Sequence, residues 1–186
     1  MHSELEPGTG LELEPEPELE PGTEAEREAD AEPHADDLGG SDPGDAGLAA
    51  ARRMFDADRA SAGLGIELVD LAVGRAVVRM RVAGGMLNGH GIGHGGYVFL
   101  LADTAFALAC NSRGPATVAA GGDISFLAPV AEGDVLTARA EERVVYGRSG
   151  IYDVTVVRGE EVSNSGRNRP EIVAEFRGRS RNVARR

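Results

Sequence analysis

The sequence predicts an α+β domain in which a curled antiparallel sheet wraps around one long central helix. Residues 96–112 form a helical stretch with no polar face, which is typical of a helix buried on all sides. Six segments with strand character accompany it, two before the helix and four after it. Short turns join these segments, which favours antiparallel neighbours, and a single apolar helix needs a sheet curled round it to be buried.

The 186 residues divide into two segments of unlike composition. Residues 1–47 carry 16 acidic side chains against the single Arg27, together with six of the nine prolines. The net charge of −12 therefore comes from this segment, and residues 48–186 are near +3. Because a Glu/Pro-rich segment buries too little apolar surface to offset its ordering entropy, we expect a disordered tail over 1–47 and one folded domain over 48–186.

The composition also excludes several classes of protein. One cysteine rules out a disulfide framework and any multi-cysteine metal site, and it suits a reducing cytoplasm. No run of 18 uncharged apolar residues exists, and the N-terminus has no basic and apolar signal pattern. The folded segment is close to neutral although all its cations are arginines. We therefore expect a cytoplasmic protein that binds neither membranes nor nucleic acids.

The elements follow one another in a simple order. Residues 48–59 have the apolar spacing of a short leading helix, and 64–71 with 75–82 have the pattern of a hairpin. Seven glycines within 84–96 mark a loop that leads into the central helix at 96–112. The remaining strands are expected at 117–126, 135–145, 151–157 and 172–181.

Asp103 is the most informative single residue. It is the only formally charged side chain between His94 and Arg113, and it lies in the middle of the helix expected to be buried. A buried carboxylate finds a partner or its pKa rises. A structural interpretation makes it a core aspartate bonded to backbone or to Thr104. A functional interpretation makes it a general base or a nucleophile.

The glycine-rich segment from Asn88 to Gly96 ends where the central helix begins. Its free backbone N–H groups, at the positive end of the helix dipole, suit an anion or a developing oxyanion. Glycine at 95 and 96 lets a ligand carbonyl approach the amides, while Asn88 and His94 offer side-chain donors. The alternative is a plain glycine-rich connection with a good N-terminal cap. The spacing fits neither a Walker A motif nor a dinucleotide fingerprint.

Other reactive side chains do not form a recognisable site. His90 and His94 are four apart but lie in a loop, so they do not predict a metal pair. Ser125 and Ser149 lack the Gly-x-Ser-x-Gly elbow, and Cys110 is interpreted as core. We therefore expect no metal and no cofactor.

Several motifs together resemble one known family. Asn88-Gly-His-Gly is followed after two residues by His94-Gly-Gly, and then by Leu-Ala-Asp-Thr-Ala-Phe over 101–106. Phe-Leu-Ala-Pro-Val over 126–130 and Gly-Arg-Ser-Gly over 147–150 continue the likeness. The sequence from about 64 to 181 thus resembles the hotdog-fold thioesterases of the phenylacetic acid degradation (PaaI) type.

The resemblance implies hydrolysis of acyl-coenzyme A (acyl-CoA) thioesters with aryl-acetyl or medium-chain acyl groups. It implies that Asp103 is the catalytic carboxylate, that Gly95 provides the oxyanion-hole amide, and that Asn88 and His94 are the polar groups around the thioester. The implied substrate-binding residues are Gly96, Thr104, Phe126, Arg148 and Ser149. Some relatives add a hydroxyl on the strand after the helix, where this chain has only Thr117 early in the strand.

The resemblance also implies chains paired edge to edge into homodimers, which assemble into tetramers. Asp103 lies eight residues beyond Gly95, or ~12 Å along a helix, so one chain cannot readily bring both to one carbon atom. We therefore expect a site shared between two chains, with Asp103 from the facing subunit activating water or attacking directly. The alternatives are an acyl-CoA hydratase on the same fold and a non-catalytic acyl-CoA-binding module.

Overall fold

The computed structural model describes residues 43–159 and 170–183, so most of the predicted tail, 1–42, lies outside the described residues. The described elements run in the order α1 (Pro43–Asp56), α2 (Arg59–Gly63), β1 (Glu67–Ala72), β2 (Arg75–Arg81), α3 (Gly95–Asn111), β3 (Thr117–Phe126), β4 (Val135–Tyr146), β5 (Ser149–Arg158) and β6 (Glu171–Asn182). A short 3-10 turn, η1 (Gly84–Met86), lies between β2 and the glycine-rich loop.

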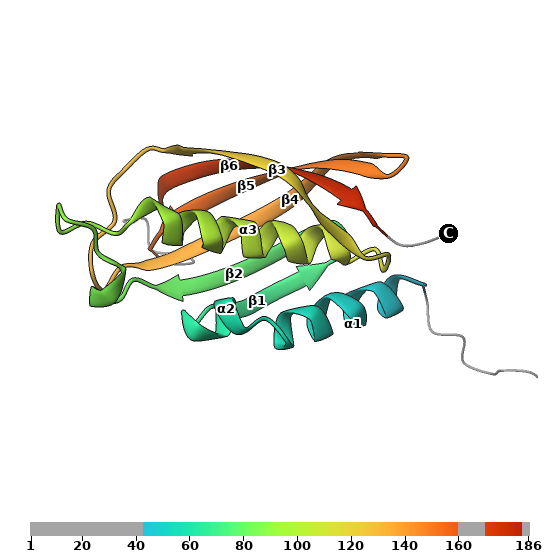
Figure 1. Ribbon diagram of the computed structural model, residues 1–186, viewed down its shortest axis with the longest axis horizontal. Helices are drawn as coiled ribbons and strands as arrows, with labels where there is room; N and C mark the ends of the chain where they lie inside the picture. The colour runs from blue at the N-terminus through green and yellow to red at the C-terminus, as the bar shows by residue number, and fades with distance from the viewer. Residues whose placement is uncertain (1–42, 160–169, 184–186) are drawn as a thin grey trace, which may run out of the picture. The chain divides into compact units, whose positions relative to one another are not determined.

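The described strands form one antiparallel sheet in the order β1-β2-β4-β5-β6-β3. β1 and β3 are its two edges, and β3 reaches its place by crossing over from the end of α3 to pair with β6. The sheet curls around α3, as Figure 1 shows. The predicted α+β class, the central helix and the six strands are therefore confirmed, each strand to within three residues at either end.

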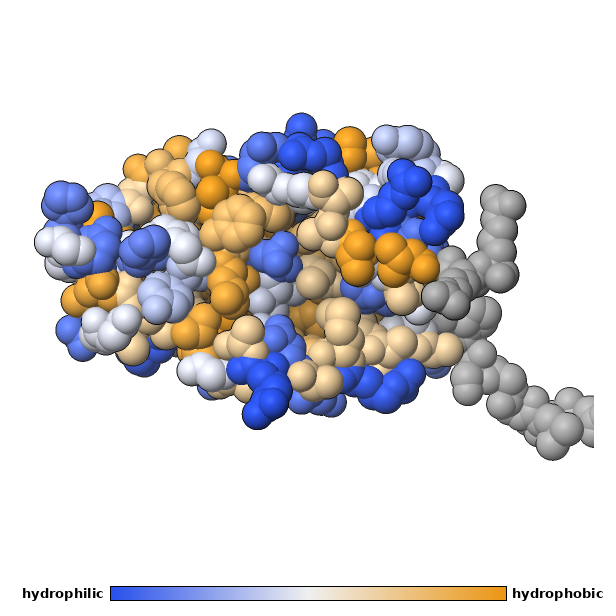
Figure 2. Space-filling model, in the orientation of Figure 1, coloured by the Kyte–Doolittle hydropathy of each residue, from blue (hydrophilic) through white to orange (hydrophobic). Residues whose placement is uncertain are grey.

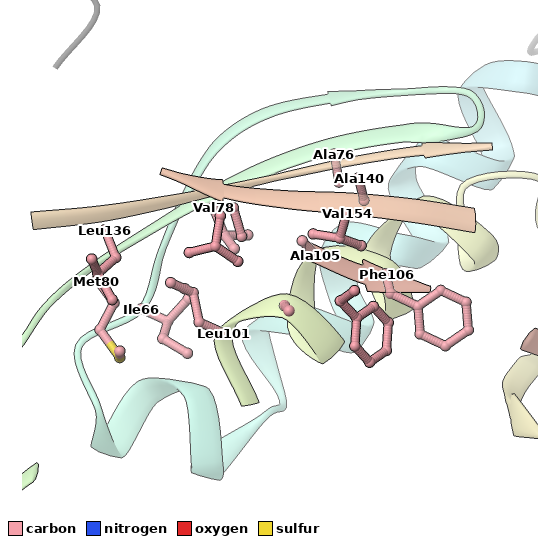
Figure 3. Packing of buried hydrophobic residues seen from close by; sticks show 14 of the residues in the cluster. Ile66, Ala76, Val78, Met80, Leu101, Ala105, Phe106, Leu136, Ala140 and Val154 are labelled. Carbon is pink, nitrogen blue, oxygen red and sulfur yellow. The ribbon is translucent and has the colours of Figure 1, made fainter. Parts of the chain in front are cut away.

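The core lies between α3 and the concave face of the sheet. Leu101, Ala105 and Phe106 of α3 pack against apolar side chains of the central strands (Figure 3). The Phe106 ring packs against the sheet at a glycine, where no side chain occupies the space. A Cβ atom on Gly178 of β6 would lie 2.7 Å from the Phe106 ring, which is closer than real contacts allow. The single helix can therefore sit close to the sheet.

The N-terminal helical region differs from the prediction. The expected helix over 48–59 is two helices, and α1 starts at Pro43 inside the segment assigned to the tail. Proline at the first helical position suits a helix start, because its missing N–H would be unbonded there. The break follows from Asp58, whose carboxylate caps α2 by accepting from the amides of Ala60 and Ser61. α1 packs on α3 through the fully buried Ala51, so the folded domain includes residues before 48.

The expectation that α3 is buried on all sides is wrong for the single chain. One stripe of the helix is only partly covered, and it consists of Gly96, Phe99, Leu100, Asp103 and Ala107. These positions recur every three or four residues and therefore share one face. The sheet, α1 and α2 cover most of the remaining helix surface. Figure 2 shows apolar side chains gathered on the side of the molecule where α3 lies.

Candidate active site

The first turn of α3 is held by the loop that precedes it. His94 is the N-cap, and its Nδ1 accepts from the Gly96 amide at 3.0 Å. The His94 amide donates to the Met86 carbonyl, and the Gly93 amide donates to the Val130 carbonyl at 2.7 Å. The loop is thus fastened on two sides, which fixes the direction in which the helix start points. With Nδ1 accepting, a neutral His94 carries its proton on Nε2 and can donate to a ligand.

Gly95 carries the free amide of this helix start. Among the described residues, nothing accepts a hydrogen bond from the Gly95 N–H, whereas the next amide is capped by His94. Helix N-termini leave such groups unpaired, and the helix dipole adds partial positive charge there. A Cβ on Gly95 would lie 2.7 Å from Cζ of Phe126. The Phe126 ring therefore lies directly against this glycine.

Asn88 shapes the loop with one side of its amide group. Its Oδ1 accepts from the His90 backbone amide at 2.8 Å, and its own backbone N–H donates to the Ile92 carbonyl at 2.8 Å. No described residue accepts from its side-chain nitrogen, so this amide is available as a donor. The sequence prediction that Asn88 and His94 offer donors near Gly95 agrees with this geometry.

A pocket of about 450 Å³ opens at this end of α3. Asn88, Gly95 and Phe126 line it together with apolar side chains that the sequence analysis did not assign to a site. Those additional lining residues are Ile92, Val98, Leu127, Ala128, Pro129, Val130 and Val173. Most of these residues belong to the motif over 126–130, which was the sequence feature that could have assigned them to the site. The pocket therefore joins an unpaired amide to an apolar chamber.

Asp103 is half-buried on the exposed stripe of α3. No described residue donates a hydrogen bond to its carboxylate, so the structural interpretation as a satisfied core aspartate finds no support. Burial raises its pKa above the usual range, and the nearby Asp58 carboxylate raises it further. A carboxylate with a raised pKa and no hydrogen-bond partner among the described residues is a stronger base than an ordinary exposed aspartate.

Four of the predicted residues are placed differently. The Thr104 hydroxyl is buried, 3.0 Å from Ser61 Oγ and 2.9 Å from the Leu100 carbonyl oxygen. Arg148 and Ser149 lie at the turn between β4 and β5 and line a separate pocket of about 320 Å³ near the C-terminal end of α3. Asp103 is likewise not part of the pocket at Gly95. One chain therefore brings together Asn88, His94, Gly95, Gly96 and Phe126, but not the other four.

Two features are absent from the described residues. In the part of the chain that the structure describes, no group of three or more His, Cys, Asp and Glu side chains is arranged to hold a metal ion. No helix there is long and apolar enough to cross a membrane. Cys110 is buried, and burial raises the pKa of its thiol to about 12. The thiol is therefore protonated at neutral pH, as expected for a core residue.

A single helix inside a curled antiparallel sheet, with an unpaired amide at the helix start, defines a hotdog-fold protein. A family model of the thioesterase superfamily matches residues 90–164. The chain is 43% identical over 133 residues to acyl-coenzyme A thioesterase PaaI of Escherichia coli (strain K12), covering 72% of this chain and 89% of that protein. The chain thus belongs to the thioesterase superfamily.

Solved structures agree with this assignment. The E. coli PaaI protein from the phenylacetic acid degradation operon matches with a TM-score of 0.69 and 40% identity, over 77% of this chain and 97% of that one. A hypothetical thioesterase of Streptococcus pneumoniae TIGR4, solved with coenzyme A, matches with a TM-score of 0.57 and 26% identity, over 65% and 90% of the two chains. The hotdog fold expected from the sequence motifs is therefore confirmed.

Proposed function

We propose that the protein hydrolyses acyl-CoA thioesters, with water and the thioester giving a free acid and coenzyme A. The observation that carries this proposal is the unpaired Gly95 amide, which opens into an apolar pocket at the positive end of α3. Such an amide stabilises the negative charge that develops on a carbonyl oxygen during attack. The relationship to an acyl-coenzyme A thioesterase supports the same reaction.

In the proposed complex the thioester oxygen accepts from the Gly95 N–H, and the acyl group enters the pocket. The Asn88 amide and His94 Nε2 donate to the thioester or to the attacking water. Asp103 belongs to the facing subunit and has two possible roles. It takes a proton from the water that attacks the carbonyl carbon, or it attacks this carbon itself and forms an anhydride that water then hydrolyses. Both routes release the thiolate of coenzyme A, which leaves as the thiol after protonation.

The protein is proposed to work as a homodimer, because the exposed stripe of α3 and the edge of β3 are both uncovered in one chain. Val118 of β3 is 50% exposed, and β3 pairs with β6 on one side only. A two-fold pairing of β3 edges lays two α3 helices antiparallel, so that Asp103 of each faces Gly95 of the other. Association of such dimers into tetramers is part of the proposal, and light scattering tests it.

This pairing would also bring to the pocket at Gly95 two predicted site residues that lie away from it in one chain. Antiparallel helices bring the C-terminal end of the second α3 beside the Asn88 loop of the first. Arg148 and Ser149, which lie at that end, then approach the same substrate from the facing subunit. Arg148 is exposed and donates to the Asn182 carbonyl at 2.8 Å, so its guanidinium keeps further donors for a phosphate of coenzyme A.

The acyl group is proposed to be an aryl-acetyl group, with medium-chain groups as weaker substrates. The pocket is lined mainly by apolar side chains, and the Phe126 ring offers an edge or a face to a second aromatic ring. We also propose a cytoplasmic location, since the sole cysteine is a buried, protonated thiol that needs no oxidising compartment.

The first test is thiol release measured across aryl-acetyl, straight-chain and enoyl-CoA substrates. Hydrolysis with a preference for the aryl-acetyl esters supports the proposal. Hydration of enoyl-CoA without thiol release would instead place the protein among the hydratases. Tight acyl-CoA binding without either reaction would make it a binding module.

The second test addresses the shared site. Asp103→Asn and the double variant Asn88→Ala/His94→Ala are each expected to be nearly inactive, and equal amounts of them are refolded together. Random pairing makes half of the dimers mixed, and each mixed dimer has one intact site, so about a quarter of wild-type activity returns. No gain despite confirmed subunit exchange would place both halves of the site in one chain.

A third experiment separates the two routes for Asp103. A single turnover in H₂¹⁸O leaves ¹⁸O in the Asp103 carboxyl only if the carboxylate attacks the carbonyl and water then opens the anhydride at the aspartyl carbon. Mass spectrometry of the peptide with Asp103 reads this out. Label found only in the product acid, even after many turnovers, supports the general-base route.

A further inference from the structure

Hydrogen-bonding groups, of which the two hydroxyls are buried, connect α2 to the turn of α3 that carries Asp103. The Asp58 carboxylate caps α2, and its second oxygen accepts from Ser61 Oγ at 2.5 Å. Ser61 Oγ lies 3.0 Å from Thr104 Oγ1, which in turn lies 2.9 Å from the Leu100 carbonyl oxygen. Ser61 is fully buried and Thr104 is 8% exposed, so water does not substitute for these contacts.

These linked groups have fewer hydroxyl protons than contacts, and this limits which group can be the donor in each hydrogen bond. The two hydroxyl groups supply one proton each, while three contacts link four groups. Ser61 donates to the ionised Asp58, so Thr104 is the donor in its contact with Ser61, and its one proton is shared between Ser61 Oγ and the Leu100 carbonyl oxygen. The burial of the two hydroxyls makes each of these bonds costly to break. The anion on α2 therefore makes Thr104, the residue after Asp103, the donor in the contact between the two helices.

The surroundings of Asp103 contain few other charges. The sheet strands turn mostly apolar side chains toward α3, and the buried titratable side chain among them is Tyr152, whose hydroxyl donates to Glu142 near the far end of the helix. The buried residue of α1 is Ala51, and Cys110 on α3 itself is a protonated thiol. Asp58 is the described charged group that acts on the Asp103 carboxyl.

We infer that Asp58 is a positioning residue for Asp103: with Ser61 and Thr104 it forms a hydrogen-bonded link, buried at the two hydroxyls, that fixes this turn of α3, and it places a negative charge near this turn. This inference rests on the proposed function, in which Asp103 takes a proton or attacks. The neighbouring anion keeps Asp103 more basic than burial alone does, because it disfavours a second negative charge. The pH at which the site becomes active is thus set partly from α2.

The main experiment compares Asp58→Asn with Asp56→Asn. Asparagine is also a good N-cap, so Asp58→Asn removes the charge while keeping α2. Asp56 is an exposed aspartate two residues earlier, and its replacement is the matched control. The pH dependence of kcat/KM is measured by thiol release, and the Asp103 carboxyl is titrated by ¹³C NMR, with Asp103→Asn assigning its resonance.

The expected result is a shift of both midpoints to lower pH in Asp58→Asn and no shift in Asp56→Asn. On the acid limb the relative activity of Asp58→Asn then exceeds that of the wild type by about two-fold or more, since a nearby like charge has been removed. A titration curve and an acid limb that superimpose on the wild type would overturn the inference. If no acyl-CoA is hydrolysed, the proposed function fails while the NMR titration still decides the inference.

A second pair of variants tests the hydroxyl link itself. Thr104→Val keeps the shape and removes the hydroxyl, whereas Thr104→Ser keeps the hydroxyl. We expect Thr104→Val to lower kcat roughly ten-fold with KM little changed, because a misoriented carboxylate slows the chemical step. Thr104→Ser should recover most of the loss. A fall in melting temperature in both variants with kcat unchanged would show that the link is only structural.

Discussion

The two ends of α3 use their polar groups in opposite ways. At the C-terminal end the Asn111 side chain donates to the carbonyls of Ala107 and Thr117 and accepts from the Thr117 amide. Ser112 Oγ accepts from the Gly74 amide and donates to the Ala109 carbonyl. At the N-terminal end the Gly95 amide has no partner among the described residues and opens into a pocket.

This contrast separates anchoring from binding on one helix. The C-terminal end is held to the turn between β1 and β2, to β3 and to α1, so it fixes the position of the helix in the sheet. The N-terminal end leaves hydrogen-bonding capacity for a ligand. Substitutions at the C-terminal end should therefore change the free energy of unfolding, and those between the centre of the helix and its start should change turnover.

The largest effect is expected for Asp103→Asn. The variant should lose about 100-fold or more in kcat, the usual scale for removing a general base, and steady-state thiol release measures it. Unchanged hydrolysis would reject Asp103 as the catalytic carboxylate.

The same variant should be slightly more stable than the wild type at pH 7. The native pKa of Asp103 is raised, so wild-type stability is lost as pH rises through that pKa, and asparagine avoids this loss. The difference in the free energy of unfolding should disappear at pH values below the unfolded pKa. Urea titrations at both pH values check this sign.

Next in size is Gly95→Ala at the N-terminal end. The new Cβ would meet the Phe126 ring at 2.7 Å, and this ring is a partly exposed side chain that can turn aside. We expect little loss of stability but about a ten-fold or greater fall in kcat/KM, because methyl and ring crowd the amide that receives the carbonyl oxygen. Equal activity in the variant would argue against an oxyanion site at Gly95.

The matching substitution at the C-terminal end of α3 is Gly47→Ala, at a residue of α1 that packs against the backbone just after α3. Here the new Cβ would lie 2.3 Å from the Ser112 carbonyl oxygen and 2.9 Å from the Gly114 nitrogen, which are backbone atoms that cannot turn aside. The variant should lose roughly 1–3 kcal/mol of stability by overpacking. Its kcat per folded molecule should stay unchanged. A neutral effect on the melting temperature would mean that α1 shifts freely on α3.

A similar effect is expected for Ser112→Ala. The change leaves the buried Gly74 amide without its acceptor and removes the bond to Ala109, at a cost of about 1–3 kcal/mol. Denaturant unfolding measures the loss, and turnover below the transition should match the wild type. A large drop in kcat instead would show that the two ends are coupled.

The smallest effect should come from removing residues 1–42. All the described packing begins with α1, so stability and kcat/KM should stay close to those of the full chain. Removing 1–47 deletes the first residues of α1 and its contact at Gly47, so this shorter protein should unfold at lower temperature. Loss of solubility or activity in the 43–186 protein would give the acidic segment a structural role.

Much of the fold could be predicted from the sequence, because the patterns that indicate its helices and strands are local. Alternation with short turns located the strands, and a charge-free run interrupted by Asp103 located α3. The break between α1 and α2 was missed because helix formers continue across it, although Asp58 as an N-cap was a usable signal. The exposed stripe of α3 could not be predicted, since an apolar surface is the same whether the chain's own sheet or a second chain covers it.

The candidate site residues also differ in whether local sequence or long-range packing determines where they lie. Asn88, His94 and Gly95 lie within eight residues, so their proximity followed from the loop itself. Arg148 and Ser149 depend on where the β4–β5 turn falls relative to α3, which no local pattern contains. Thr104 was expected near substrate, but in one chain its hydroxyl is bound to α2, a long-range contact that residue type alone does not indicate.

The sole cysteine offers a practical advantage for spectroscopy. Cys110 is buried and its thiol pKa is raised to about 12, so in the folded protein it should not react with maleimides or disulfide reagents at neutral pH. Reagents that report free coenzyme A therefore have no protein background. A cysteine introduced on an exposed position would be the sole labelling site of each chain, so that spin-label distances between subunits can be measured without first removing a native residue.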